Sequence, residues 1–134
     1  MLRGLTQSHR QWLSSVNQRQ ALRERWEAFF EKHDALIAPV SATTAFPHMQ
    51  DSPKESQTLM VNGSARPNAD TYFWLGLASV PYLPSTTFPA GLSAEGLPIG
   101  LQIIGPEFAD LACIALAEQL EALHFRFVPP TAYR

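Results

Sequence analysis

The sequence predicts an α/β fold in which helices pack on a mixed β-sheet. The segment from Ser8 to His33 contains neither glycine nor proline and indicates a long helix, whereas the apolar runs Leu83–Phe88 and Leu97–Ile104 indicate strands. The chain has 134 residues, of which 46% are apolar, and this size and composition suit one domain. We therefore expect a single domain over residues 1–134.

The first element is a helix predicted over residues 8–33, a segment rich in Gln, Arg, Glu, Leu and Ala, which lose little side-chain freedom in a helix. At about 100° per residue, one face of this helix gathers Trp12, Val16, Trp26 and Phe30. Arg19 and Arg23 project from the same face, so its middle is expected either to be solvated or to meet carboxylates from elsewhere in the fold. The apolar ends of this face need a covering surface.

A short buried strand is predicted next, over residues 35–38, because an apolar run closes at Pro39, which cannot donate to a sheet ladder. Over residues 40–68 the composition turns to Ser, Thr, Pro, Asn and Gln, which predicts an extended loop. A loop of this length is uncommon in a compact domain and is usually a functional flap or covered by a partner. Within it, Asn62-Gly63-Ser64 matches a glycosylation sequence but is interpreted as a turn.

A second helix is predicted over residues 70–79, with Asn68 or Asp70 as its N-cap and Val80-Pro81 as its end. A β-hairpin follows over residues 83–104, with two glycines in its connection. Neither face of the second strand is polar throughout, so we expect this strand inside a sheet that is covered on both sides.

The last predicted helix covers residues 110–124 and carries one apolar face, formed by Cys113, Leu116, Leu120 and Leu123. The segment from Phe125 to Val128 favours a further edge strand. Cys113 is the single cysteine, and its place on an apolar face favours an inert core thiol. Because one cysteine allows no internal disulfide, a reducing cytoplasm is the expected location.

Charge and hydropathy disfavour two classes of partner. Ten Lys and Arg against twelve Asp and Glu give a net charge of -2, which offers no broad basic field for nucleic acid. The longest apolar run, Leu111–Ala117, is far shorter than the roughly 20 residues of a membrane-spanning helix. We therefore expect neither a nucleic-acid partner nor a membrane segment.

The common motifs of nucleotide and metal chemistry are also missing from the sequence. The seven glycines form no G-x-G-x-x-G fingerprint, no P-loop and no G-x-S-x-G elbow. Zinc sites need closely spaced ligands, and the histidines do not provide that spacing: they are His9, His33, His48 and His124. No metal and no cofactor is predicted.

The chain resembles the C-terminal part of the amidase signature family in three stretches, which are HDALIAPVSATTAFPH, VNGSARPNADTYFW and PSTTFPAGLSAEGLPIGLQIIGPEFADLACIALAEQLE. The resemblance covers roughly Trp12 to Pro130 and is sharpest at Pro89-Ala90-Gly91 and at residues 96–105. That family includes bacterial amidases, fatty-acid amide hydrolases and the A component of the glutamyl-tRNA amidotransferase. The resemblance implies that this chain is a C-terminal fragment of the amidase signature fold.

The resemblance also implies hydrolysis of a carboxamide C–N bond by a serine nucleophile, a second serine in a cis peptide and a lysine base, all in a Gly/Ser-rich stretch. This chain has no Gly-Gly-Ser-Ser run, and its two lysines, Lys32 and Lys54, lie in polar surroundings. No catalytic residue is therefore assigned to it. The fragment is expected to be inactive alone and to act on a small-molecule amide only within a full-length enzyme.

Four residues are candidates for substrate binding on the strength of the resemblance. Asp70 matches an acidic residue that holds the substrate amine in the glutaminyl branch, and Trp74 would share its helical face. Phe46 and Asn62 lie in the long loop and could form a pocket wall. The alternatives are that Asp70 caps a helix, that Trp74 is core, and that the loop residues only cover the fold. For Gln102 we expect a buried amide hydrogen bond.

Two further functions stay open at this point. A fragment with an uncovered apolar face could be a non-catalytic interaction or folding module, which predicts a homo-oligomer, most simply a two-fold dimer. Alternatively, the chain could be part of a glutamyl-tRNA amidotransferase A-like protein that acts on aminoacyl-tRNA, although its charge offers no basic cluster.

Overall fold

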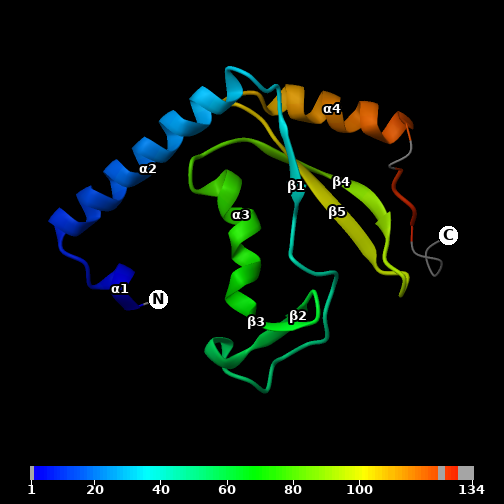
Figure 1. The fold of residues 1–134 in the computed structure, drawn as a ribbon, viewed down its shortest axis with the longest axis horizontal. Helices are drawn as coiled ribbons and strands as arrows, with labels where there is room; N and C mark the ends of the chain where they lie inside the picture. Colours follow the sequence, from blue (N-terminus) through cyan, green and yellow to red (C-terminus); the bar gives the residue numbers. More distant parts are fainter. Residues whose placement is uncertain (1, 124–125, 130–134) are drawn as a thin grey trace.

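The computed structural model describes residues 2–123 and 126–129. The elements follow in the order α1 (Leu2–Leu5), α2 (His9–Phe30), β1 (Leu36–Pro39), β2 (Thr58–Val61), β3 (Ser64–Pro67), α3 (Tyr72–Ser79), β4 (Ser85–Leu92), β5 (Pro98–Ile104) and α4 (Asp110–Leu123). Two 3₁₀ turns, Lys54–Ser56 and Asn68–Thr71, complete the order. Helices and sheets alternate along the chain, so the predicted α/β class is confirmed (Figure 1).

The main sheet has the order β1-β5-β4, with β5 in the centre. Both neighbours run antiparallel to β5, with Ile37 opposite Ile103 and Thr86 opposite the same residue on the other side. The sequence predicts a mixed sheet, and the described strands instead pair only antiparallel, because the β4–β5 connection is a hairpin and β1 adds to the free edge of β5. A bulge between Pro89 and Gly91 interrupts the β4–β5 ladder.

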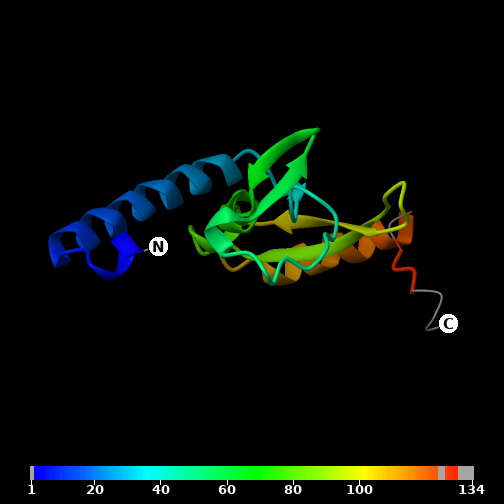
Figure 2. The same ribbon diagram turned by 90° about the horizontal axis from the view of Figure 1, so that it is seen from below.

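Helix α4 covers one face of this sheet, and the β2–β3 hairpin lies on the other side (Figure 2). The buried cluster under α4 contains Phe88, Ile103 and Cys113, with further contacts from Leu101, Leu116 and Leu120. Cys113 is 2% exposed, as expected of a core thiol. Gly105 permits this close approach of helix and sheet, because a Cβ on Gly105 would lie only 2.5 Å from the Cys113 sulfur.

The long helix α2 begins with a capping box. The Ser8 hydroxyl accepts from the Gln11 backbone N–H, and the Gln11 side chain accepts from the Ser8 N–H, so two N-terminal donors are satisfied. The helix ends at Phe30, three residues before the predicted end at residue 33. None of its residues is buried by the described chain, and its N-terminal half extends away from the sheet (Figure 1).

The arginines of the α2 face attach the helix to the body of the fold. Arg23 forms an ion pair with Glu107, so its charge does meet a carboxylate from elsewhere, which was one of the two expectations. Arg19 and Arg23 also lie over the Tyr82 ring, at 4.8 and 5.7 Å from its centroid. Trp12, by contrast, stays 47% exposed near the far end of α2.

The prediction of a continuous loop over residues 40–68 is wrong, because the described chain forms the β2–β3 hairpin there. Its two turn residues, Asn62 and Gly63, have φ angles of 49° and 77°. Positive φ at both central positions is the backbone of a two-residue type I′ turn, which Asn-Gly favours most. The interpretation of Asn62-Gly63 as a turn is therefore confirmed.

The predicted helix over residues 70–79 is divided into the 3₁₀ turn Asn68–Thr71 and α3. Neither Asn68 nor Asp70 caps it with a side-chain hydrogen bond, because both side chains bind other residues. Toward the other end of the chain, α4 covers Asp110–Leu123. His124 and Phe125 lie outside the described residues, and residues 126–129 form no strand, so the predicted edge strand is not seen there.

Candidate functional site

A groove of about 560 Å³ lies between the β2–β3 hairpin and α3. Its lining comes from four parts of the chain and comprises Ala42, Val61, Asn62, Ser64, Arg66, Asp70, Phe73 and Trp74. Three of the four residues predicted from the sequence, Asn62, Asp70 and Trp74, are thus brought to one groove. The fourth, Phe46, lies apart from them.

Phe46 borders a separate groove of about 400 Å³ near the first strand of the hairpin, together with Pro47, Met49, Leu59 and Met60. Its ring is 43% exposed. The structure therefore does not join Phe46 to the groove of Asp70 and Trp74, and a role for Phe46 in substrate binding stays a prediction.

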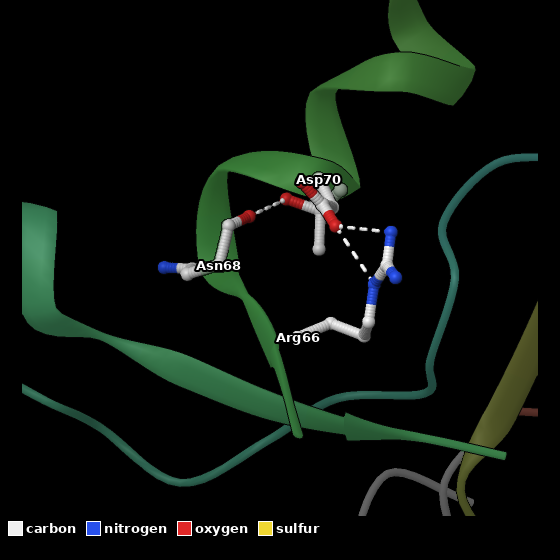
Figure 3. A network of polar contacts seen from close by, with 4 residues as sticks. Arg66, Asn68 and Asp70 are labelled. Carbon is white, nitrogen blue, oxygen red and sulfur yellow. Dashed lines mark hydrogen bonds and ion pairs between the residues drawn. The ribbon is translucent and has the colours of Figure 1, made fainter. Parts of the chain in front are cut away.

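Asp70 points toward Arg66, which the sequence did not single out (Figure 3). The Arg66 Nε and Nη2 atoms lie 3.0 and 2.9 Å from the same carboxylate oxygen, Asp70 Oδ2. The two side chains are 60% and 41% exposed, so water screens the pair and it is weak. Asp70 therefore brings a partly neutralised carboxylate to the groove. The i, i+4 spacing of this pair runs from a strand into a 3₁₀ turn, so the rule for helical pairs does not indicate it.

Asn68 orients the turn that carries Asp70. Its backbone N–H and side-chain Nδ2 donate to the backbone carbonyl and the Oε1 of Gln57, at 2.8 and 2.9 Å. Its carbonyl accepts from the Thr71 hydroxyl at 2.7 Å. Figure 3 shows the Asn68 amide directed away from Arg66 and Asp70. These bonds fix the backbone at the start of α3 and leave the carboxylate of Asp70 to the groove.

Trp74 supplies an aromatic wall. Its ring is partly buried and meets the Phe73 ring edge-on, with 5.3 Å between the centroids. Its backbone carbonyl accepts a hydrogen bond of 3.0 Å from the Gln102 side chain. The expected buried amide bond of Gln102 is thereby confirmed, and it ties the groove wall to β5.

The groove offers recognition but no bond-breaking group. Lys32 and Lys54 are both exposed and neither lines it. In residues 2–123 and 126–129, no group of three or more His, Cys, Asp or Glu side chains is placed to hold a metal ion. Within the same ranges, no helix is long and apolar enough to span a membrane. An aromatic wall, an exposed asparagine and a paired carboxylate suit a small polar molecule with a planar apolar part.

Known proteins are similar to this chain in sequence. The sequence model of the family described as Amidase matches residues 2–114. The A component of the glutamyl-tRNA(Gln) amidotransferase from Leptospira interrogans serogroup Icterohaemorrhagiae serovar copenhageni (strain Fiocruz L1-130) is 33% identical over 112 residues, which are 81% of this chain and 21% of that protein. The chain thus spans about a fifth of the length of this relative.

Solved structures show the same similarity. A bacterial aryl acylamidase of the amidase signature enzymes family superposes with a TM-score of 0.71 at 28% identity, over 88% of this chain and 24% of that one. A chain from a vestigial protein complex, described as revealing the evolutionary origins of an s-triazine catabolic enzyme, superposes with a TM-score of 0.78 at 22% identity, covering 96% of this chain and 27% of that one. The second likeness concerns the fold alone.

Proposed function

Because the chain belongs to the amidase family, we propose that the groove of Asn62, Asp70 and Trp74 forms part of the substrate-binding wall of a carboxamide hydrolase. The supporting observation is that these three residues, from a hairpin turn, a 3₁₀ turn and a helix, line one groove. The substrate class is a small-molecule amide, with Trp74 against its planar part. No cofactor is needed for this reaction.

The proposal assigns bond breaking to polypeptide beyond this chain. A serine hydroxyl would attack the amide carbonyl, the amine would leave as an acyl-serine forms, and water would then release the acid. This chain would bind and orient, and alone it would hydrolyse nothing. The test is release of 4-nitroaniline from 4-nitroacetanilide by the purified chain, with no release expected. Turnover that disappears on substitution of one of its own serines would refute the assignment.

Binding tests the groove itself. Acetanilide is titrated into the chain and followed by ligand-observed NMR. Trp74→Ala is expected to weaken binding about fivefold, because an aromatic contact is worth about 1 kcal/mol. Leu111→Ala is the matched control, since Leu111 is 81% exposed on α4, on the far side of the sheet. Equal affinities for wild type and Trp74→Ala would remove the groove from consideration.

A second candidate is an amidotransferase A-like function, favoured by the 33% identity to such a protein. Under it, the groove would prefer glutamine to acetanilide, and Asp70 would hold the amine. The Arg66–Asp70 pair opposes this preference, because an incoming ammonium group must compete with Arg66 for the carboxylate. Tighter binding of glutamine than of acetanilide would favour this candidate over the first.

A third candidate is a non-catalytic interaction module, favoured by a different surface. An apolar groove of about 590 Å³ runs between α2 and α3 and is lined by Leu22, Arg25, Trp26, Phe29, Leu36, Phe73, Gly76, Leu77 and Val80. Open apolar surface of this kind drives association, so we propose a homo-oligomer, most simply a two-fold dimer. Sedimentation as a monomer at micromolar concentration would count against it.

We also propose a cytoplasmic location. Cys113 is the single cysteine of the sequence and is buried and unpaired, so this chain has no disulfide that would need an oxidising compartment. Fractionation of cells that produce the chain, with detection in the cytosolic fraction, is the test.

A further inference from the structure

Gln102 is a buried polar side chain, 3% exposed, at the centre of the main sheet. Its amide joins three other elements. The oxygen accepts from the Ser85 hydroxyl on β4 at 2.9 Å, and the nitrogen donates to the carbonyl of Pro39 on β1 at 2.8 Å and to that of Trp74 on α3 at 3.0 Å. Both N–H donors of the amide are thus used, and both go to backbone carbonyls.

The apolar contacts of α3 do not define its position closely. Of the eight residues of this fully described helix, only Ala78 is buried. Tyr72 and Phe73 are each 63% exposed, and Leu75 is 49% exposed. Grooves lie on two sides of the helix, and Phe73 borders both of them. Because α3 has open space on two sides, the directional hydrogen bond from Gln102 to its backbone can determine the position of the helix.

We propose that Gln102 is a positioning residue for the groove: its amide holds the backbone of α3 against the sheet and thereby sets where the Trp74 ring stands. The importance of Gln102 for substrate binding rests on the proposed function. The structural role of Gln102 stands on its bond to the Trp74 carbonyl. Losing that bond would remove the side-chain hydrogen bond that ties the α3 backbone to β5, so the wall would be free to move.

The test uses Trp74 as a reporter, in the full chain with Trp12→Phe and Trp26→Phe. Gln102→Met keeps the side-chain length and removes the amide. We expect acrylamide to quench Trp74 at least twofold more strongly in this variant, and acetanilide to bind about threefold more weakly, which is less than the loss expected of Trp74→Ala. Ser85→Ala is the matched control, because it removes a different hydrogen bond of the same amide and leaves the bond to Trp74 in place. It is expected to change neither measurement.

Gln102→Glu adds a reading that a loss of overall stability would not give. Once it is ionised, the new carboxylate faces two carbonyl oxygens and cannot donate, so above its pKa this variant should behave like Gln102→Met. On acidification the carboxylic acid regains one donor, and Trp74 quenching should return toward the wild-type value, whereas the wild type itself should not change. Unaltered quenching of Trp74 in folded Gln102→Met would overturn the proposal.

Hydrogen exchange in the wild type tests the positioning role of Gln102 even if the variants fail to fold. We expect the side-chain amide protons of Gln102 to exchange slowly and together with the backbone amides of α3; exchange at the rate of a free amide would also overturn the proposal. The two failures can be told apart. If the wild type does not bind acetanilide, the proposed function fails, but the comparison of Trp74 quenching between wild type and variants still tests the role of Gln102.

Discussion

The guanidinium of Arg23 and the carboxylate of Glu107 lie 2.5 Å apart and join α2 to the segment before α4, across 84 positions of the sequence. The two side chains are only 25% and 31% exposed. Since none of the residues of α2 is buried, this ion pair and the contacts with Tyr82 are the polar attachment of the helix within the described chain.

Glu107→Gln should therefore loosen α2. We expect a free energy of unfolding lower by about 0.5–1 kcal/mol, since the pair is partly screened by water. Urea denaturation measures the change, and 1 M salt should shrink it. Glu118→Gln on the exposed side of α4 is the control, and an equal loss in that variant would contradict the role of the pair.

Gly105→Ala should destabilise the core by about 1–3 kcal/mol, because its Cβ would lie 2.5 Å from the Cys113 sulfur. Gly100→Ala is the matched control, since its nearest contact at 3.7 Å is ordinary. The double variant Gly105→Ala with Cys113→Ala should recover part of the loss. A double-mutant cycle without coupling would show that the clash is relieved elsewhere.

The free energy of unfolding should decrease as the pH rises past the pKa of an ordinary thiol, about 8.5. Burial raises the pKa of Cys113, and the nearby Asp110 carboxylate raises it further. A thiol with a higher pKa in the folded chain contributes stability below its unfolded pKa of about 8.5, and this contribution is lost as pH rises through the folded pKa. Urea midpoints from about pH 8 to 10 should decline more steeply for wild type than for Cys113→Ala. Parallel slopes would argue against the shift.

Gly63→Ala should weaken the β2–β3 hairpin locally. An alanine at a φ of 77° is strained by about 1–2 kcal/mol, whereas the space around this position is open. Faster hydrogen exchange of the hairpin amides, with the exchange of β5 unchanged, is the expected result. Gly4→Ala in α1, where φ is not positive, should leave the hairpin amides as they are.

Arg66→Gln should free the Asp70 carboxylate for a cationic ligand. We expect glycinamide to bind about threefold more tightly, a change of about 0.7 kcal/mol that suits an exposed ion pair. Calorimetry with acetamide supplies the uncharged comparison, whose affinity should not change. If both amides gain equally, the effect is steric rather than electrostatic.

The long elements could be predicted from the sequence. The range predicted for the first helix contains α2, and the predicted hairpin contains β4 and β5, because their patterns extend over many residues. The β2–β3 hairpin was missed because the prolines at 53 and 67 outweighed the Asn62-Gly63 signal between two short runs. The antiparallel pairing of β1 with β5 could not be predicted either, since it is set by contacts between segments that are distant in the sequence.

The candidate site was predictable only in part. Asp70 and Trp74 came from a resemblance, and the structure brings them to one groove with Asn62. The pairing of Arg66 with Asp70 is not predictable from the sequence, because it joins a strand to a 3₁₀ turn, where the i, i+4 rule of helices does not apply. The place of Phe46 depends on the path of residues 40–57, which carries no periodic pattern.

The prolines of the outer strands have a consequence for storage and crystallisation. Within the described sheet, β1 ends at Pro39, and β4 is interrupted at Pro89 beside its bulge. A four-residue strand that ends in proline and a strand broken by a bulge are poor templates for a neighbouring molecule, so stacking of copies into continuous fibrils along these edges is discouraged. Concentrated samples should therefore resist the growth of amyloid-like ribbons through the main sheet, which thioflavin fluorescence would reveal.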